Sequence, residues 1–136
     1  MPALSLSLSR QCLDTAMTKA TKEFGRPICV AVCDAQGFLV AFARMEASPV
    51  RSIQISQGKA YTAARMGVST DAVLARLKKE GIEIGYFCDP LLTALAGGSP
   101  LKNSAGVLIG GIGVSGLTSA EDHIITEFIA EQVRSA

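Results

Sequence analysis

The sequence predicts one α+β domain, spanning residues 1–136, with a mainly antiparallel sheet and flanking helices. Three observations support this prediction. A length of 136 residues fits one domain. Two pairs of extended segments are each joined by a short turn, which favours hairpins. Segments with helical character precede, separate and follow these pairs, an order typical of an α+β arrangement.

The first segment, residues 9–24, has the periodicity of an amphipathic helix. Its apolar residues recur three and four positions apart, and they are Leu13, Ala16, Met17, Ala20 and Phe24. Gly25 and Pro27 end this helix, because neither residue continues one readily.

A β-hairpin is predicted next. The runs 28–33 and 38–43 are apolar at almost every position, and Asp34-Ala35-Gln36-Gly37 joins them. Asp and Gly favour tight hairpin turns. Because the runs are so apolar, we expect much of the sheet to be covered on both faces, by helices or by another subunit.

Two helices and a loop are predicted in the middle of the chain. Residues 52–66 contain no Pro and are rich in Ala, Gln and Lys, which favours a helix despite Gly58. Residues 72–79 predict a third, short helix. Residues 81–100 contain scattered Gly and Pro without a period, which indicates a loop, and loops of this length are often functional.

A second hairpin and a final helix complete the prediction. Residues 106–115 predict a strand, which a turn at 103–106 pairs with a short strand at 100–102. Thr118-Ser119-Ala120-Glu121 has the form of a capping box at the start of a helix. We expect one face of that helix to be apolar through Ile124, Ile125, Phe128, Ile129 and Val133.

Composition and charge exclude two classes of protein. Thirteen Lys and Arg stand against twelve Asp and Glu without basic clusters, so the electrostatic footprint of nucleic-acid binding is absent. The longest apolar stretch, 106–114, is about half of the roughly 18 residues that span a bilayer, so a membrane-spanning protein is not expected.

The sequence also suggests a location and an oligomeric state. Residues 1–10 lack the pattern of a signal peptide, so a cytoplasmic protein is expected. The low charged fraction of 18% favours a homo-oligomer.

The four cysteines predict neither disulfides nor a metal site. Cys29 and Cys33 lie in one apolar run, and as a strand they share a face with Ala31, which is typical of small buried residues. Cytosolic thiols stay reduced, and a zinc site needs ligands that this chain barely has. We therefore expect inert thiols.

Three stretches of the sequence form one pattern, defined by their order and by the spacing between them. They are 30–37 running into 39–45, then Lys59-Ala60-Tyr61-Thr62-Ala63, and then Gly97-Gly98-Ser99-Pro100 followed by 110–116 and Glu121-Asp122. In these stretches the chain resembles the GlcG/HbpS family, also met as the carboxy-terminal domain of PduO-type proteins. The resemblance implies a profilin-like fold, higher homo-oligomers, and binding of haem or another small ligand in some members.

The sequence departs from the family pattern at the residue that binds the haem iron. Haem-binding relatives use a His in the first helix, whereas residues 9–24 contain none. His123, the single His of the sequence, falls on the polar side of the last helix, which predicts a solvated side chain. Haem iron is also held by Cys, Met or Tyr. These alternatives stay open at Cys12, Met17, Met45, Tyr61 and Met66.

The glycine pattern Gly111-x-Gly113-x-x-Gly116 satisfies the dinucleotide-binding fingerprint, follows a predicted strand and precedes a helix, but it fails the wider test. The acidic residue expected about 20 residues later would fall at the end of the sequence, and no strand follows the last helix to complete a βαβ unit. We therefore interpret these glycines as sites of close backbone packing at a strand end.

Six residues form the predicted ligand site. Backbone N–H groups at Ser115 and Gly116 precede a helix and favour an anion, and Gly97 and Gly98 allow a loop to approach the same ligand. Arg44 ends a strand and could pair with a carboxylate. Lys59 lies on the apolar side of its helix with Ile55, Thr62 and Met66, and a buried ammonium needs a partner. Structural roles for all six stay open: turns for the glycines, and snorkelling or ion pairs for the cations.

Two functions are consistent with these residues. The first is a small-molecule binding protein of the GlcG/HbpS type, with haem or a related, anionic ligand bound in an oligomer. The second is a small catabolic enzyme acting on an unsaturated or 2-oxo organic acid by proton transfer, with Arg44 or Lys59 holding the carboxylate. No Ser-His-Asp, HExxH or paired-carboxylate pattern indicates a mechanism.

Overall fold

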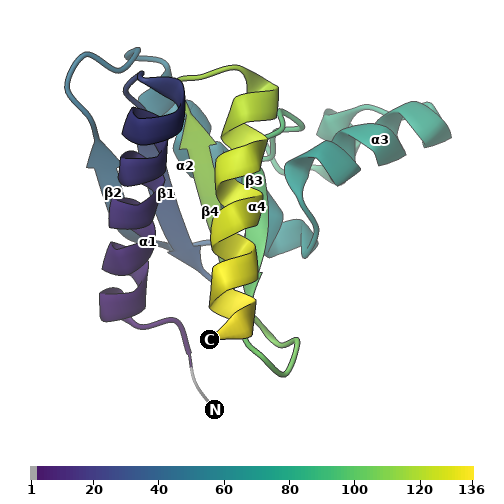
Figure 1. Cartoon of the computed structure of the whole chain (residues 1–136). Helices are drawn as coiled ribbons and strands as arrows, with labels where there is room; N and C mark the ends of the chain where they lie inside the picture. Colours follow the sequence, from purple (N-terminus) through teal and green to yellow (C-terminus); the bar gives the residue numbers. More distant parts are fainter. Residues whose placement is uncertain (1–2) are drawn as a thin grey trace.

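The computed structural model describes residues 3–136 and shows a four-stranded, fully antiparallel sheet with the strand order β2-β1-β4-β3 (Figure 1). The elements are α1 (Leu6–Lys19), η1 (Ala20–Phe24), β1 (Cys29–Asp34), β2 (Leu39–Arg44), α2 (Ser52–Met66), α3 (Thr70–Glu80), η2 (Ile84–Phe87), β3 (Gly98–Lys102), β4 (Leu108–Ser115) and α4 (Ser119–Ser135). The single α+β domain and the two hairpins predicted from the sequence are confirmed.

The helices form a layer on each face of the sheet. Helices α1 and α4 lie side by side on one face, where α1 packs on β1 and β2 and α4 on β3 and β4, whereas α2 lies on the opposite face (Figure 1). Helix α3 extends to the side, beyond β3. Among residues 3–136, no helix is both long and apolar enough to cross a membrane.

The alternation of the strands divides the core between these two layers. Val30 and Val32 of β1 join Ile112 of β4 in the larger cluster beneath α1 and α4. Ala31 and Cys33 point the other way, toward α2. Strand β1 is therefore buried on both sides, as predicted from its continuous apolar sequence.

Helix α2 lies unusually close to the sheet because strand β4 is rich in glycine. A Cβ at Gly113 would clash with the backbone of Ser56, and one at Gly111 would clash with the carbonyl of Ala60. The interpretation of these glycines as positions of close packing is confirmed. The contact lies along the middle of the strand and not at its end.

Edge strand β2 is covered less well than the sequence suggests. Helix α1 covers the face that carries Ala41 and Ala43, but α2 barely reaches the opposite face. A bulge at Val40 separates Leu39 from Ala41 in the pairing with β1, and Leu39 stays 52% exposed. The expected second cover over β2 is absent from the described chain.

Several boundaries differ from the predicted ones. The first helix begins at Leu6, because the side chain of Ser5 caps it, and it ends in the π-helical turn η1. Part of the predicted loop 81–100 forms the short helix η2 and the start of β3. The capping box at Thr118 and Glu121 is confirmed. Ile124 and Phe128 were wrongly placed on the buried face of α4: they are 49% and 41% exposed.

Candidate functional site

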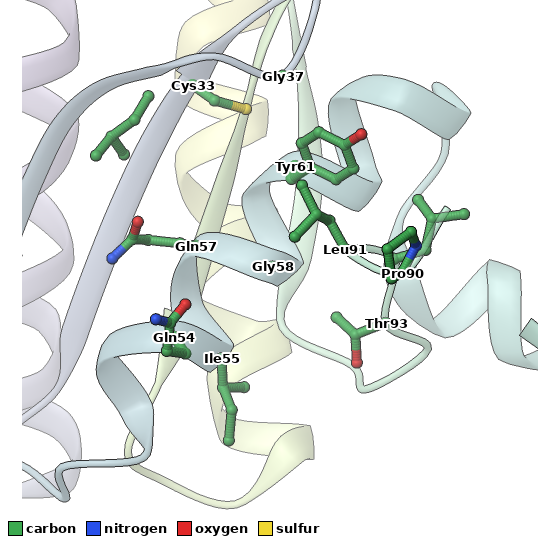
Figure 2. A pocket seen from close by; sticks show the side chains of 12 residues that line it. Cys33, Gly37, Gln54, Ile55, Gln57, Gly58, Tyr61, Pro90, Leu91 and Thr93 are labelled. Carbon is green, nitrogen blue, oxygen red and sulfur yellow. The ribbon is translucent and has the colours of Figure 1, made fainter. Parts of the chain in front are cut away.

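A cavity of about 400 Å³ lies beside α2, between the β1–β2 turn and the segment 90–93 (Figure 2). Apolar side chains make up much of its wall. It is lined by Cys33, Gly37, Leu39, Gln54, Ile55, Gln57, Gly58, Tyr61, Pro90, Leu91, Leu92 and Thr93. We call it the α2 cavity.

Hydrogen bonds fix the segment 90–93 against α2. The Thr93 N–H donates to Thr62 Oγ1 at 2.9 Å, and the Leu91 N–H donates to Asp89 Oδ1 at 3.1 Å. The segment lies close to Gly58 of α2, where a Cβ would make ordinary van der Waals contact with the Leu91 carbonyl oxygen at 3.5 Å. The cavity wall is thus built on a rigid helix and a pinned loop.

Tyr61 and Asp89 form a hydrogen-bonded pair at the cavity. The hydroxyl of Tyr61 donates to Asp89 Oδ2 at 2.6 Å. This bond raises the pKa of Tyr61 and lowers the pKa of Asp89, because it stabilises the phenol together with the carboxylate. The pair therefore holds its proton on the phenol oxygen at neutral pH.

Arg65 and Gly37 complete the surroundings of Tyr61. The Arg65 guanidinium carbon lies 5.0 Å from the centre of the Tyr61 ring, and Arg65 Nε donates to the Gln36 carbonyl at 2.7 Å. Gly37 has a φ of +97°, and a Cβ there would lie 2.8 Å from the Tyr61 ring. The turn glycine thus serves both the hairpin and the close approach of the ring.

Cys33, at the floor of the cavity, is an inert thiol. It is buried, and its Sγ donates to the Ala60 carbonyl at 3.2 Å. Burial raises the pKa of the Cys33 thiol to about 12, so the reactive thiolate is not formed at neutral pH. Within residues 3–136, no group of three His, Cys, Asp or Glu side chains is arranged to hold a metal ion.

The six predicted site residues lie elsewhere, and none of them lines the α2 cavity. Arg44 and Ser115 pair with Cys29 from its two sides, so all three form one row across the sheet. Arg44 is exposed at the end of this row. Ser115 is buried and bonds to Ser52 Oγ of α2 at 3.1 Å.

Lys59 is fully buried and already has its partner. Its ammonium donates to Asp122 Oδ2 at 3.0 Å and to the Val114 carbonyl at 2.9 Å. Burial lowers the pKa of Lys59 and raises that of Asp122, whereas their mutual attraction opposes both shifts. Asp122 thus provides the partner that the buried Lys59 ammonium needs, where a ligand carboxylate was expected from the sequence.

The predicted glycines pack around this ion pair and the adjacent strand end. A Cβ at Gly97 would lie 2.9 Å from Lys59 Nζ, and one at Gly98 would clash with the Lys59 carbonyl. Gly116 lies against the Pro27 carbonyl. The predicted proximity of Lys59 to Gly97 and Gly98 is therefore confirmed, whereas ligand contact by the six residues stays a prediction.

His123 is less solvated than its position in the sequence suggests. Its side chain is 30% exposed, its Nε2 lies 3.8 Å from Asp71 Oδ2, and its buried Nδ1 has no hydrogen-bond partner in the part of the chain that the structure describes. It does not line the α2 cavity.

Sequence reasoning missed the α2 cavity because its residues come from three distant segments. One feature of the sequence did point to this cavity. Tyr61 belongs to the stretch 59–63 and is among the residues considered as haem-iron ligands.

An antiparallel sheet with the order β2-β1-β4-β3, two helices on one face and one on the other defines an HbpS-like α+β domain. The chain belongs to the family "Haem degrading protein HbpS-like", whose family model matches residues 4–130. A relative in Citrobacter freundii, the uncharacterized 15.0 kDa protein of the dhaT-dhaS intergenic region, is 30% identical over 128 residues, which cover 91% of this chain and 87% of the relative.

Crystal structures of related proteins share the fold. The ORFY protein of Klebsiella pneumoniae superposes with a TM-score of 0.87 at 25% identity, covering 100% of this chain and 93% of that protein. A PduOC complex with haem superposes with a TM-score of 0.84 at 26% identity, covering 96% and 94%. HbpS gives a TM-score of 0.86 at 25% identity, covering 98% and 92%. The predicted family and fold are confirmed.

Proposed function

We propose that this protein binds haem, or a related flat and anionic molecule, in the α2 cavity. The α2 cavity itself is the observation that carries the proposal. Its volume of about 400 Å³ falls in the range of roughly 300–1,000 Å³ common for ligand pockets. The family supports the choice of ligand, because one relative of the same fold was crystallised with haem.

The residues of the α2 cavity fit such a ligand. Leu39, Ile55 and Leu91 offer apolar surface for a flat ring. Arg65 beside Tyr61 offers a cation near the cavity for a carboxylate, since among residues 3–136 only its Nε donates a hydrogen bond. Bound haem would supply an iron centre able to accept an axial ligand from the protein.

A haem titration followed by visible absorbance tests the proposal. We expect a saturable shift of the Soret band with one haem per subunit. Gln54→Trp should weaken binding, because the indole would occupy the cavity from an exposed position on α2. Gln11→Trp, at an exposed position of α1 across the sheet, is the matched control and should bind as the parent does. Equal binding by both variants would place the ligand elsewhere.

We further propose that the protein is a homo-oligomer. Phe38, Leu39 and Leu91 are 64%, 52% and 61% exposed, and the latter two line the cavity. Exposed apolar surface of this kind is typical of contacts with another chain. A second copy on this side would also supply the missing cover over β2.

A second candidate function is proton transfer on an unsaturated or 2-oxo acid. The pair Tyr61–Asp89 favours it, since a phenol and a carboxylate 2.6 Å apart can exchange a proton with a substrate beside the Arg65 cation. Arg65 takes the role expected for Arg44 or Lys59. Exchange of substrate protons for deuterium in heavy water, followed by NMR, should then depend on Tyr61. An absence of exchange in the parent protein would exclude this function.

A further inference from the structure

The five residues that the sequence leaves open as haem ligands lie in different parts of the fold. Cys12 is buried in the larger core cluster, and burial raises the pKa of its thiol to about 11. Met17 and Met45 pack against the same cluster, and Met45 Sδ already accepts the Ile28 N–H at 3.4 Å. Met66 does not line the α2 cavity. Of these candidates, Tyr61 alone lines it.

The Tyr61 side chain is held in place from three sides. Asp89 accepts its hydroxyl proton, Gly37 lies against its ring, and Arg65 lies over the ring face. The hydroxyl donates to Asp89, and none of the hydrogen bonds among the described residues has the Tyr61 oxygen as acceptor, so its lone pairs are free. An oxygen with free lone pairs on a fixed aromatic side chain is a suitable metal ligand.

We propose that Tyr61 supplies the axial oxygen for the iron of bound ferric haem, in place of the first-helix His that this sequence lacks. This inference rests on the haem-binding function proposed above. Tyrosine is an established type of haem ligand. Tyr61 would have to release its hydroxyl proton to ligate ferric iron, and Asp89 Oδ2, which accepts the hydroxyl in a hydrogen bond, would pass this proton on to solvent because the pKa of Asp89 is lowered. The guanidinium of Arg65 stabilises the negative charge that the phenol oxygen acquires.

The test compares ferric haem with metal-free protoporphyrin, which offers the same ring without iron. Both ligands are titrated into the parent protein, Tyr61→Phe and Tyr86→Phe. The last variant is the matched control, because the chain has two tyrosines and Tyr86 is exposed outside the cavity. Tyr61→Phe should lose affinity for haem by about tenfold or more, which is about 1.4 kcal/mol. It should also lose the phenolate-to-iron charge-transfer band.

The affinity of Tyr61→Phe for protoporphyrin should stay close to that of the parent. An unchanged haem spectrum in Tyr61→Phe would overturn the assignment of Tyr61 while leaving haem binding intact. An equal loss of affinity for haem and for protoporphyrin would also overturn it, because Tyr61 would then act only as part of the cavity wall. If the parent protein binds neither ligand, the proposed function fails together with the inference.

Discussion

The ammonium of Lys59 lies 3.0 Å from the carboxylate of Asp122, although the two residues are 63 positions apart in the sequence, and both side chains are 2% exposed. This ion pair joins α2 to the first turn of α4 across the end of strand β4, where Val114 accepts a second hydrogen bond from Lys59. Asp122 also accepts the Leu117 N–H through its other oxygen. The pair thus fixes both layers of helices to the sheet.

We expect Lys59→Met to destabilise the protein by about 3–5 kcal/mol, the usual effect of removing one member of a buried ion pair. Replacing both Lys59 and Asp122 by apolar residues should recover most of the loss. Urea unfolding measures these changes, with Lys22→Met at an exposed position as control. A stable Lys59→Met protein would contradict the pairing.

Gly113→Ala should destabilise the protein strongly, by about 3 kcal/mol or more, because overpacking a tight core costs roughly 1–3 kcal/mol and here the added methyl meets backbone. Gly85→Ala is the control, since a Cβ at Gly85 meets nothing within 4 Å. Thermal melts of both variants test this. Equal melting temperatures would show that α2 can move away from β4 at little cost.

The thiols should differ sharply in reactivity at neutral pH. Cys88 is exposed, whereas Cys12, Cys29 and Cys33 are buried. We expect a thiol reagent to label Cys88 in the folded protein and the other three only after unfolding. Mass spectrometry counts the labels. Rapid labelling of Cys33 in the folded protein would show that the floor of the α2 cavity opens.

Stability should fall at alkaline pH. Burial raises the pKa of Cys33 from 9.0 to about 12, so between these values the folded state holds a proton that the unfolded state has released. The contribution is fully present below pH 9 and is lost as the pH rises toward 12. Unfolding by urea from pH 8 to 11 should show this decline, and Cys33→Ala should weaken it. An identical decline in Cys33→Ala would assign it to other groups.

Light scattering at micromolar concentration should report a multiple of the 14.2 kDa chain mass. The exposed apolar residues Phe38 and Leu39 motivate this expectation. Leu39→Lys should shift the mass toward that of one chain. A parent protein of 14.2 kDa in solution would refute the homo-oligomer.

His123→Ala should leave any haem spectrum unchanged, because His123 lies near Asp71 of α3 and outside the lining of the α2 cavity. Absorbance of the haem-loaded variant tests this. Loss of the spectrum would place the ligand beside α4 and remove the basis for assigning Tyr61.

The sequence by itself determined the helices, both hairpins and the family, because these depend on local signals. Short apolar runs, the turn 34–37 and the capping box at Thr118 each act over a few residues. The start of α1 and the start of β3 were not predicted correctly. The cap at Ser5 determines where α1 begins, and pairing with β4 determines where β3 begins.

Only the tertiary structure decided what the site residues do. The partner of Lys59, the burial of Ser115 and the gathering of Tyr61, Gly37 and Leu91 around one cavity all join segments far apart in the chain. Periodicity shows which face of a helix is apolar, but not which distant side chain meets that face. For this reason the sequence indicated that a buried ammonium needed a neutralising partner, and the fold alone showed that Asp122 provides it.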